Sequence, residues 1–102
     1  MAKKSIHRPE YDVFAGLLRD VRIREALTQG QLAERLAIDQ SMVSDAERAV
    51  RRLDIVQIRD WAQACGLSLD AFVQEFEQRL REMDQHQGWD RDGRRNPVNL
   101  NR

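Results

Sequence analysis

The sequence is poor in cysteine, carries no net charge and contains no long apolar run. Its 102 residues include one cysteine, Cys65, and equal numbers of acidic and basic side chains. A single cysteine cannot form a disulfide within the chain, and no cluster of cysteines or histidines lies near it to complete a metal site. Disulfide and zinc scaffolds are therefore excluded, and the fold must depend on a hydrophobic core.

Uninterrupted apolar stretches are at most two or three residues long. A membrane-spanning helix needs about 20 predominantly apolar residues, so no span is expected. Lys3 and Lys4 near the start of the chain are followed by no apolar segment, which a secretory signal would require. We therefore expect a protein without membrane contact that is located in the cytoplasm, where a lone cysteine stays reduced.

Residue patterns typical of enzymes are also missing. The sequence has no paired carboxylates, no serine–histidine–aspartate set, no glycine-rich phosphate loop and no His-Glu-x-x-His motif. Cys65 has no neighbouring base that would make it a nucleophile, and His7 and His86 fall near the ends of the expected fold. The sequence predicts a protein that is not an enzyme and that uses no metal or cofactor.

The zero net charge hides a division along the chain. Residues 1–53 carry 10 basic and 8 acidic side chains, residues 54–87 carry 3 and 7, and residues 88–102 carry 4 and 2. The acidic excess therefore lies in the second half of the chain. A basic surface for phosphates is available on the first half, although this modest asymmetry does not by itself identify a partner.

Apolar residues recur at helical spacing along most of the chain, and no segment alternates as a strand would. We predict an all-α fold of five helices, the first over residues 9–25 with Pro9 at a favourable first position. The later helices are expected after the capping residues Thr28, Asp39 or Gln40, Asp54 and Ser68. Residues 1–8 are expected to form an arm, residues 9–87 the helical domain, and residues 88–102 a flexible tail.

Residues 29–48 have the pattern of a helix-turn-helix. Small or apolar residues occur where two short helices would cross and face a common core, at Leu32, Ala33, Leu36, Ile38, Val43 and Ala46. Ala33 is small enough for a close crossing, and Ile38 would fill the corner of the turn. The remaining face of the later helix carries short polar side chains, Gln40, Ser41, Ser44 and Asp45, which can approach the edges of base pairs.

This region resembles the helix-turn-helix regulators of the phage-repressor (Xre-like) class. The resemblance rests on Leu18 to Arg22, Leu27-Thr28-Gln29 to Leu32-Ala33, Gln40-Ser41-Met42-Val43-Ser44 to Glu47, and Arg51-Arg52. It covers roughly residues 11–76, and the combined spacing is far more specific than any single segment. The resemblance implies a sequence-specific transcription regulator that binds double-stranded DNA.

Three positions depart from the family pattern. The family usually has glycine before the second helix, in the turn and after the glutamate, where this sequence has Ala26, Ala37 and Ala49. Alanine in the left-handed conformation is strained by about 1 kcal/mol. These corners could therefore be built differently from those of the family, which affects local geometry more than function.

The resemblance implies roles for the polar residues of the helix-turn-helix. Gln29 would bond a phosphate and brace Gln40, and the amide of Gln40 would pair with the N6 and N7 atoms of an adenine. Ser41, Met42 and Ser44 would belong to the same DNA-contacting face. The alternatives are that Gln29 is an ordinary surface residue at a helix start and that Gln40 only caps its helix.

The charged residues after this face have two interpretations. Asp45 could accept a bond from the N4 of a cytosine, or it could be the ion-pair partner of Arg48 three residues later. Arg48, Arg51 and Arg52 are candidates for phosphate contact because they follow the reading helix directly, and the alternative is a solvated charge run.

Arg22 and Glu47 correspond, by the resemblance, to a structural ion pair that would join the first helix to the third. If the pair is buried, loss of one partner would destabilise the protein by about 3–5 kcal/mol. We therefore assign Arg22 and Glu47 to the scaffold.

The fifth helix is longer than the expected core needs. Its core residues are expected to be Leu69, Phe72, Val73 and Phe76. Leu80 and Met83 continue the same stripe and would be left over, which predicts a dimer interface formed by Phe76, Leu80 and Met83. The leading hypothesis is a homodimeric repressor that binds a palindromic operator. The alternatives are an antitoxin or phage accessory regulator that docks a protein partner through the fifth helix or the tail, and an interaction module that does not bind DNA.

Overall fold

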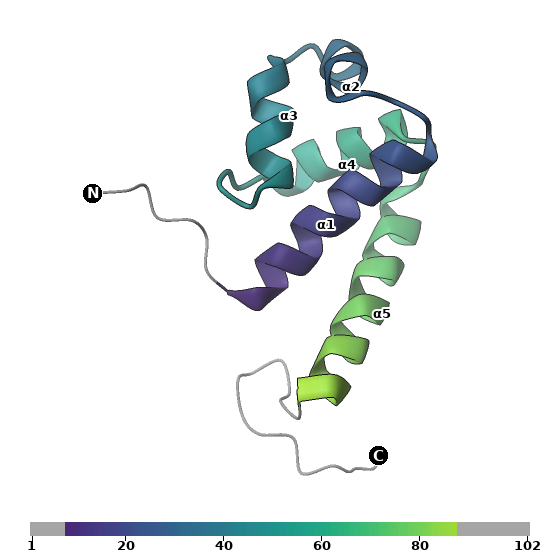
Figure 1. Ribbon diagram of the computed structural model, residues 1–102. Helices are drawn as coiled ribbons and strands as arrows, with labels where there is room; N and C mark the ends of the chain where they lie inside the picture. Colours follow the sequence, from purple (N-terminus) through teal and green to yellow (C-terminus); the bar gives the residue numbers. More distant parts are fainter. Residues whose placement is uncertain (1–7, 88–102) are drawn as a thin grey trace, which may run out of the picture.

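The computed structural model describes residues 8–87, which form five α-helices and no strand (Figure 1). The helices are α1 (Pro9–Arg24), α2 (Gln29–Leu36), α3 (Gln40–Glu47), α4 (Ile55–Ala64) and α5 (Leu69–Gln87). This confirms the predicted all-α, five-helix fold. The expected tail, the arm except for Arg8, and the side chain of His86 lie outside the described residues.

The helix starts follow from the capping residues. The side chains of Thr28 and Asp54 each accept a bond from the backbone N–H three residues later, and their own backbone N–H groups donate to the side-chain oxygen of that same residue, a glutamine in both cases. The hydroxyl of Ser68 accepts a bond from the Ala71 backbone at 3.0 Å. Asp39 precedes α3 without a side-chain capping bond. Three of the four expected caps therefore satisfy backbone groups that a helix start leaves open.

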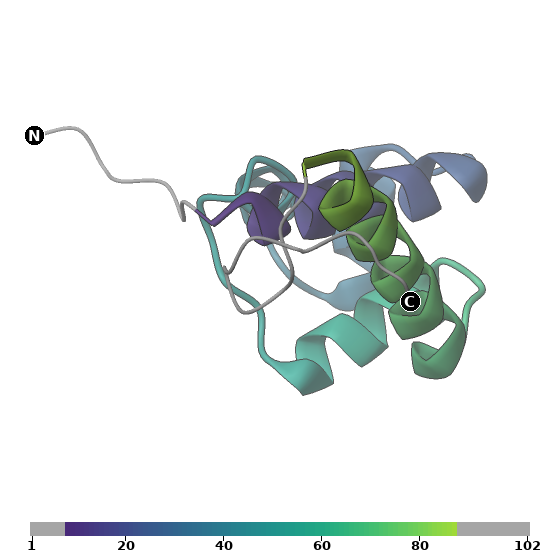
Figure 2. The same cartoon turned by 90° about the horizontal axis from the view of Figure 1, so that it is seen from below.

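The helices surround one apolar core. Trp61 of α4 is 1% exposed, and its ring N–H donates to the Leu18 carbonyl of α1 at 3.1 Å. Phe14 meets Phe72 and Phe76 edge-on, with ring centroids 6.0 and 5.8 Å apart. The first contact joins α4 to α1 and the ring contacts join α1 to α5, and α5 also packs against α4 (Figure 2). No helix in the described part of the chain is both long and apolar enough to cross a bilayer.

Cys65, at the end of α4, is 5% exposed and packs in the core. Burial away from water raises the pKa of its thiol to about 11, and the nearby Glu25 carboxylate acts in the same direction. The thiol is therefore protonated at neutral pH.

Two expectations for α5 were wrong. Val73, expected in the core, is 40% exposed, whereas Leu80, expected to be left over, is only 4% exposed. The reason is the direction in which α5 crosses α1. Residues spaced by four, Phe72, Phe76 and Leu80, face the body of the molecule, and Val73 lies about 100° further round the helix. Ion pairs of Arg24 with Glu75 and of Arg79 with Asp20 add to this contact. The bond from Arg24, and next the one from Arg79, lower the pKa of the Glu75 carboxyl.

The three alanines that replace the family glycines all adopt the left-handed conformation. Their φ angles are 60° at Ala26, 58° at Ala37 and 62° at Ala49, close to what glycine would adopt. In each case the next residue's backbone N–H donates to a carbonyl five residues earlier, as it does after Gly66. The corners are therefore not rebuilt, and the alanines carry the strain.

We expect the substitution Ala37→Gly to raise the free energy of unfolding by about 0.5–1 kcal/mol, because it relieves left-handed strain at an exposed corner. Ala49→Gly is the matched comparison. It relieves the same strain but removes the methyl group of a residue that is only 6% exposed, and burial of such a group is worth about 0.8 kcal/mol. Its net effect should be close to zero. Equal gains for the two variants in urea unfolding would contradict this explanation.

Candidate nucleic-acid interface

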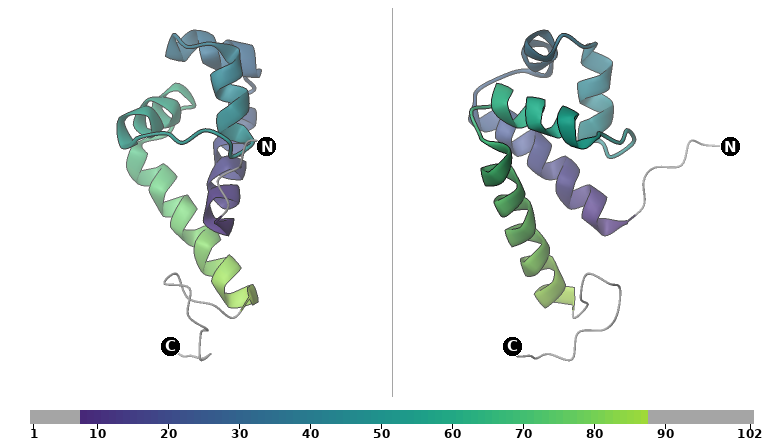
Figure 3. Two further views of the ribbon diagram at one scale, coloured as in Figure 1. Left: turned by 90° about the vertical axis from the view of Figure 1, so that its left-hand side faces the viewer. Right: turned by 180° about the vertical axis from the view of Figure 1, so that it is seen from behind.

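The α2–α3 pair is held by its inward residues. Leu32 and Val43 are completely buried and Ala33 is 4% exposed, so the two helices cross closely. Ile38 packs against the core at the corner after the left-handed Ala37. The pair lies at one end of the molecule, and the far end of α5 lies at the other (Figure 3). The predicted packing of the helix-turn-helix is therefore confirmed.

The outward face of α3 is polar. Val43 and Ala46 are buried, whereas Gln40 and Ser41 are exposed. Met42, Ser44 and Asp45 are half-buried on the same short helix. Gln40, Ser41, Ser44 and Asp45 therefore form one polar face, and Met42 borders this face beside a small hollow that Leu36, Ile38 and Trp61 also line.

Arg22 of α1 and Glu47 of α3 form a buried, two-bonded ion pair. The Arg22 Nε and Nη2 atoms donate to the two carboxylate oxygens of Glu47 at 2.6 and 2.9 Å, and Nη1 donates to the Leu27 carbonyl at 2.8 Å. The Glu47 side chain is 3% exposed and that of Arg22 is 10% exposed. The bonds that Arg22 donates to Glu47 raise the pKa of Arg22, against the opposing effect of burial.

The side chain of Gln29 bonds to this ion pair and not to Gln40, its expected partner. Its side-chain nitrogen donates to the Glu47 Oε1 atom at 3.0 Å, because an ionised carboxylate is a stronger acceptor than an amide. Gln40 instead lies over Gly30, where its Oε1 atom is 3.5 Å from the position that a Cβ on Gly30 would occupy. The expected brace between the two glutamines is thus replaced by separate contacts, and the start of α2 is tied to α3 through Glu47.

The basic residues after α3 have different surroundings. Arg48 donates to the Asp45 carboxylate at 2.5 Å, so Asp45 is the partner of Arg48 in this structure. Arg52 lies over the ring of Tyr11 at 5.2 Å from its centroid, which holds the guanidinium beside α1. Arg51 is exposed. The contact of Arg52 with Tyr11 could not be predicted from the sequence, because no local pattern links residues so far apart in the chain.

The comparisons with known proteins agree with this geometry. The family model of a helix-turn-helix domain matches residues 13–73. An XRE-family like protein from Pseudomonas syringae pv. tomato str. DC3000 is 35% identical, with 72% of this chain and 90% of that chain covered and a TM-score of 0.66. A comparison with curated proteins found no match.

Two more distant structures share the fold. The restriction-modification controller protein C.Esp1396I, a tetramer in complex with its natural 35 base-pair operator, is 19% identical, covers 71% of this chain and 95% of its own, and has a TM-score of 0.65. The clp gene regulator ClgR from Corynebacterium glutamicum is 18% identical, covers 76% and 83%, and has a TM-score of 0.69.

The matched region is more than half of the chain, so the protein belongs to the helix-turn-helix domain family. Within this family, the structure with 35% identity is an XRE-family like protein. The protein is an XRE-like DNA-binding regulator.

We expect Glu47→Ala to lower the free energy of unfolding by about 3–5 kcal/mol, because it leaves Arg22 buried without its counter-charge. Asp45→Ala is a control on the same helix. It breaks an ion pair in which the Arg48 side chain is 65% exposed, and such pairs contribute about 0–1 kcal/mol. Urea unfolding monitored by circular dichroism compares the two variants. Similar losses would show that the Arg22–Glu47 pair does not hold the scaffold together.

Proposed function

We propose that the protein represses transcription by binding a two-fold symmetric DNA operator as a homodimer. The observation that carries this proposal is the polar face of α3, which is held by the buried Arg22–Glu47 pair at one end of the molecule. A helix presented in this way can enter the major groove, where the pattern of donors and acceptors distinguishes all four base pairs. Repression then requires only that the bound protein occlude a promoter.

The reading residues are proposed to act as follows. Gln40 can donate to N7 and accept from N6 of an adenine in a two-bonded pair. Ser41 and Ser44 can bond to a base or a phosphate, and Met42 can contact a thymine methyl group. Asp45 can hold Arg48 in position until Arg48 meets a phosphate.

Phosphate contacts are proposed at both ends of this face. The amide nitrogen of Gln29 has two N–H groups, and the bond to Glu47 uses only one of them, which leaves the second for a phosphate. Gln29 also begins α2, where backbone N–H groups favour an anion. Arg48, Arg51 and Arg52 supply positive charge after α3.

A homodimer is proposed because one α3 helix reads only about four or five base pairs, which gives weak discrimination. A two-fold protein doubles these contacts on a two-fold site. The operator complex of the tetrameric controller protein C.Esp1396I supports an oligomer for this fold.

The direct test is selection of bound duplexes from a random DNA pool. We expect the recovered sequences to share two inverted half-sites about one helical turn apart. Recovery of no common sequence would contradict the proposal, and a common sequence without symmetry would contradict the homodimer.

We predict that Gln40→Ala weakens binding to the selected site by about 1–3 kcal/mol and leaves the affinity for random DNA nearly unchanged. Gln74, an exposed glutamine of α5, provides the control substitution Gln74→Ala, which should change neither affinity. Both affinities can be measured by fluorescence anisotropy at one salt concentration. Equal losses on specific and random DNA would show that Gln40 does not read a base.

We predict that the double substitution Arg51→Ala and Arg52→Ala weakens binding to every DNA sequence. The slope of log K against log salt should become shallower by up to about two units, because up to two phosphate contacts are lost. Arg81→Ala is the control, since Arg81 lies on α5 and donates to Gln78. An unchanged slope in the double variant would mean that these two arginines do not contact phosphates.

A further inference from the structure

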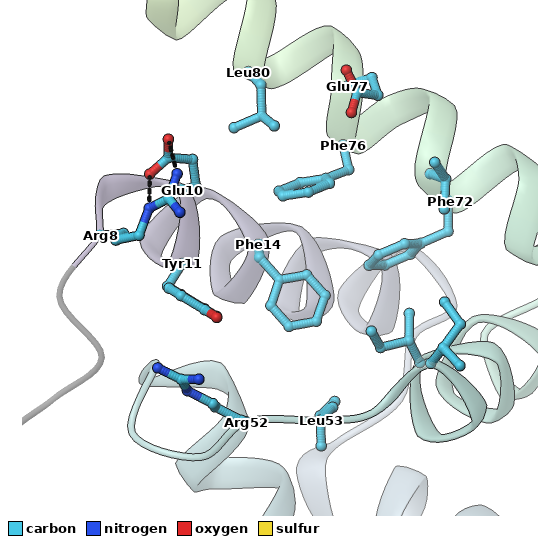
Figure 4. Close-up of a pocket in the computed structure, with 13 residues that line it drawn as sticks. Arg8, Glu10, Tyr11, Phe14, Arg52, Leu53, Phe72, Phe76, Glu77 and Leu80 are labelled. Carbon is cyan, nitrogen blue, oxygen red and sulfur yellow. Dashed lines mark hydrogen bonds and ion pairs between the residues drawn. The ribbon is translucent and has the colours of Figure 1, made fainter. Parts of the chain in front are cut away.

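Several of the residues proposed to contact DNA are held by a partner within the protein. Gln29 and Arg48 each donate to a carboxylate. Arg52 lies over the ring of Tyr11, which places its guanidinium beside the first turn of α1 (Figure 4). Gln40 differs from them, because within the described part of the chain its side chain takes part in no hydrogen bond or ion pair. The position of its amide therefore depends on packing.

The side chain of Gln40 packs against Gly30 in the first turn of α2. Around the point that a Cβ on Gly30 would occupy, the nearest atoms are the Gln40 Oε1 at 3.5 Å, the Gln40 Cδ at 3.9 Å and the Thr28 hydroxyl oxygen at 3.9 Å. The oxygen of the amide is thus closer to this point than its nitrogen is. This orientation is favourable, because the backbone N–H groups at a helix start attract a carbonyl oxygen.

The backbone does not require a glycine at position 30. Among the described glycines, only Gly66 has a positive φ, so Gly30 has a helical conformation that any residue could adopt. The three corners where glycine would relieve strain carry alanine instead. Within a helix of only eight residues, glycine lowers stability relative to alanine. What glycine provides here is the space in which the Gln40 amide lies.

This space is limited. An alanine methyl at position 30 would contact the Gln40 oxygen at 3.5 Å and cover part of its surface. A longer side chain would need the volume that the amide itself fills. Gly16 of α1 provides a contrast, because a Cβ there would meet no atom within 4 Å.

We infer that Gly30 is a positioning residue for base reading. Because Gly30 has no side chain, the Gln40 amide can lie against α2 and can turn its oxygen and its nitrogen together towards one base. A two-bonded pair with adenine needs both atoms, and a side chain at position 30 would confine or displace them. Gly30 would thus affect discrimination between bases and not the general affinity for phosphates. The inference rests on the proposed function and adds to it a residue that contacts no base.

The test uses the full chain with Gly30→Ala or Gly30→Leu, and with Gly16→Ala as the matched control. Alanine and leucine both favour a helix over glycine, so the fold should keep its stability. We expect affinity for the selected DNA site to fall about threefold with Gly30→Ala and about tenfold or more with Gly30→Leu, within the loss that removal of a two-bonded base contact causes. Affinity for random DNA should stay the same, and Gly16→Ala should change neither affinity.

A double substitution shows whether the effect acts through Gln40. In a protein that already carries Gln40→Ala, Gly30→Leu should cause no further loss of affinity. A further loss would overturn the inference, and so would equal losses on specific and random DNA, because a leucine that blocked a phosphate at the start of α2 would produce both results. Normal affinity for the selected site in Gly30→Leu would overturn it as well.

NMR spectroscopy of side-chain amides tests the contact in the absence of DNA. The pair of signals that is lost in Gln40→Ala should shift in Gly30→Leu and stay in place in Gly16→Ala. An unshifted pair in Gly30→Leu would overturn the inference even if the protein binds a selected site. A shifted pair together with absence of any selected DNA site would support the contact between Gly30 and Gln40 while contradicting the proposed function.

Discussion

The buried contact between Arg22 and Glu47 is the interaction on which the rest of the structure depends. It joins α1 to α3. Arg22 also bonds to the Leu27 carbonyl at the corner between α1 and α2, and Glu47 accepts a bond from Gln29 at the start of α2. Two buried charges are tolerated because they face one another and because all three guanidinium nitrogens of Arg22 and both carboxylate oxygens of Glu47 are hydrogen-bonded within the protein. The buried pair fixes the position of α3, so the outward side chains of this helix are not needed to hold it in place and can be short and polar.

The charged side chains are also divided between the scaffold and the region around α3. Arg24 and Arg79 pair with acidic residues between α1 and α5, away from α3. Near α3, Arg48 is balanced by Asp45, and Arg51 and Arg52 lie in the segment that follows. A chain with no net charge can thus present basic side chains in one place. Binding to DNA would then depend on a few local contacts more than on overall attraction, which limits association with random sequence.

Local signals predicted most of the fold, and tertiary geometry decided what they missed. Thr28 and Asp54 marked helix starts because capping is a property of a few adjacent residues. The exposures of Val73 and Leu80 depended on how α5 crosses α1, which helical periodicity does not specify. Family resemblance located the polar face of α3 and the Arg22–Glu47 pair. It did not predict that Gln29 bonds to Glu47, because an amide chooses among acceptors that only the folded chain brings together.

The buried thiol of Cys65 has a further consequence, for measuring how the molecule moves. Its surroundings keep it protonated and covered, so a thiol reagent can reach it only when the region around the end of α4 opens. The labelling rate would then report the free energy of that opening without any introduced probe. Since α4 packs on α1, α2 and α5, such a rate reports how firmly α4 is held against these three helices.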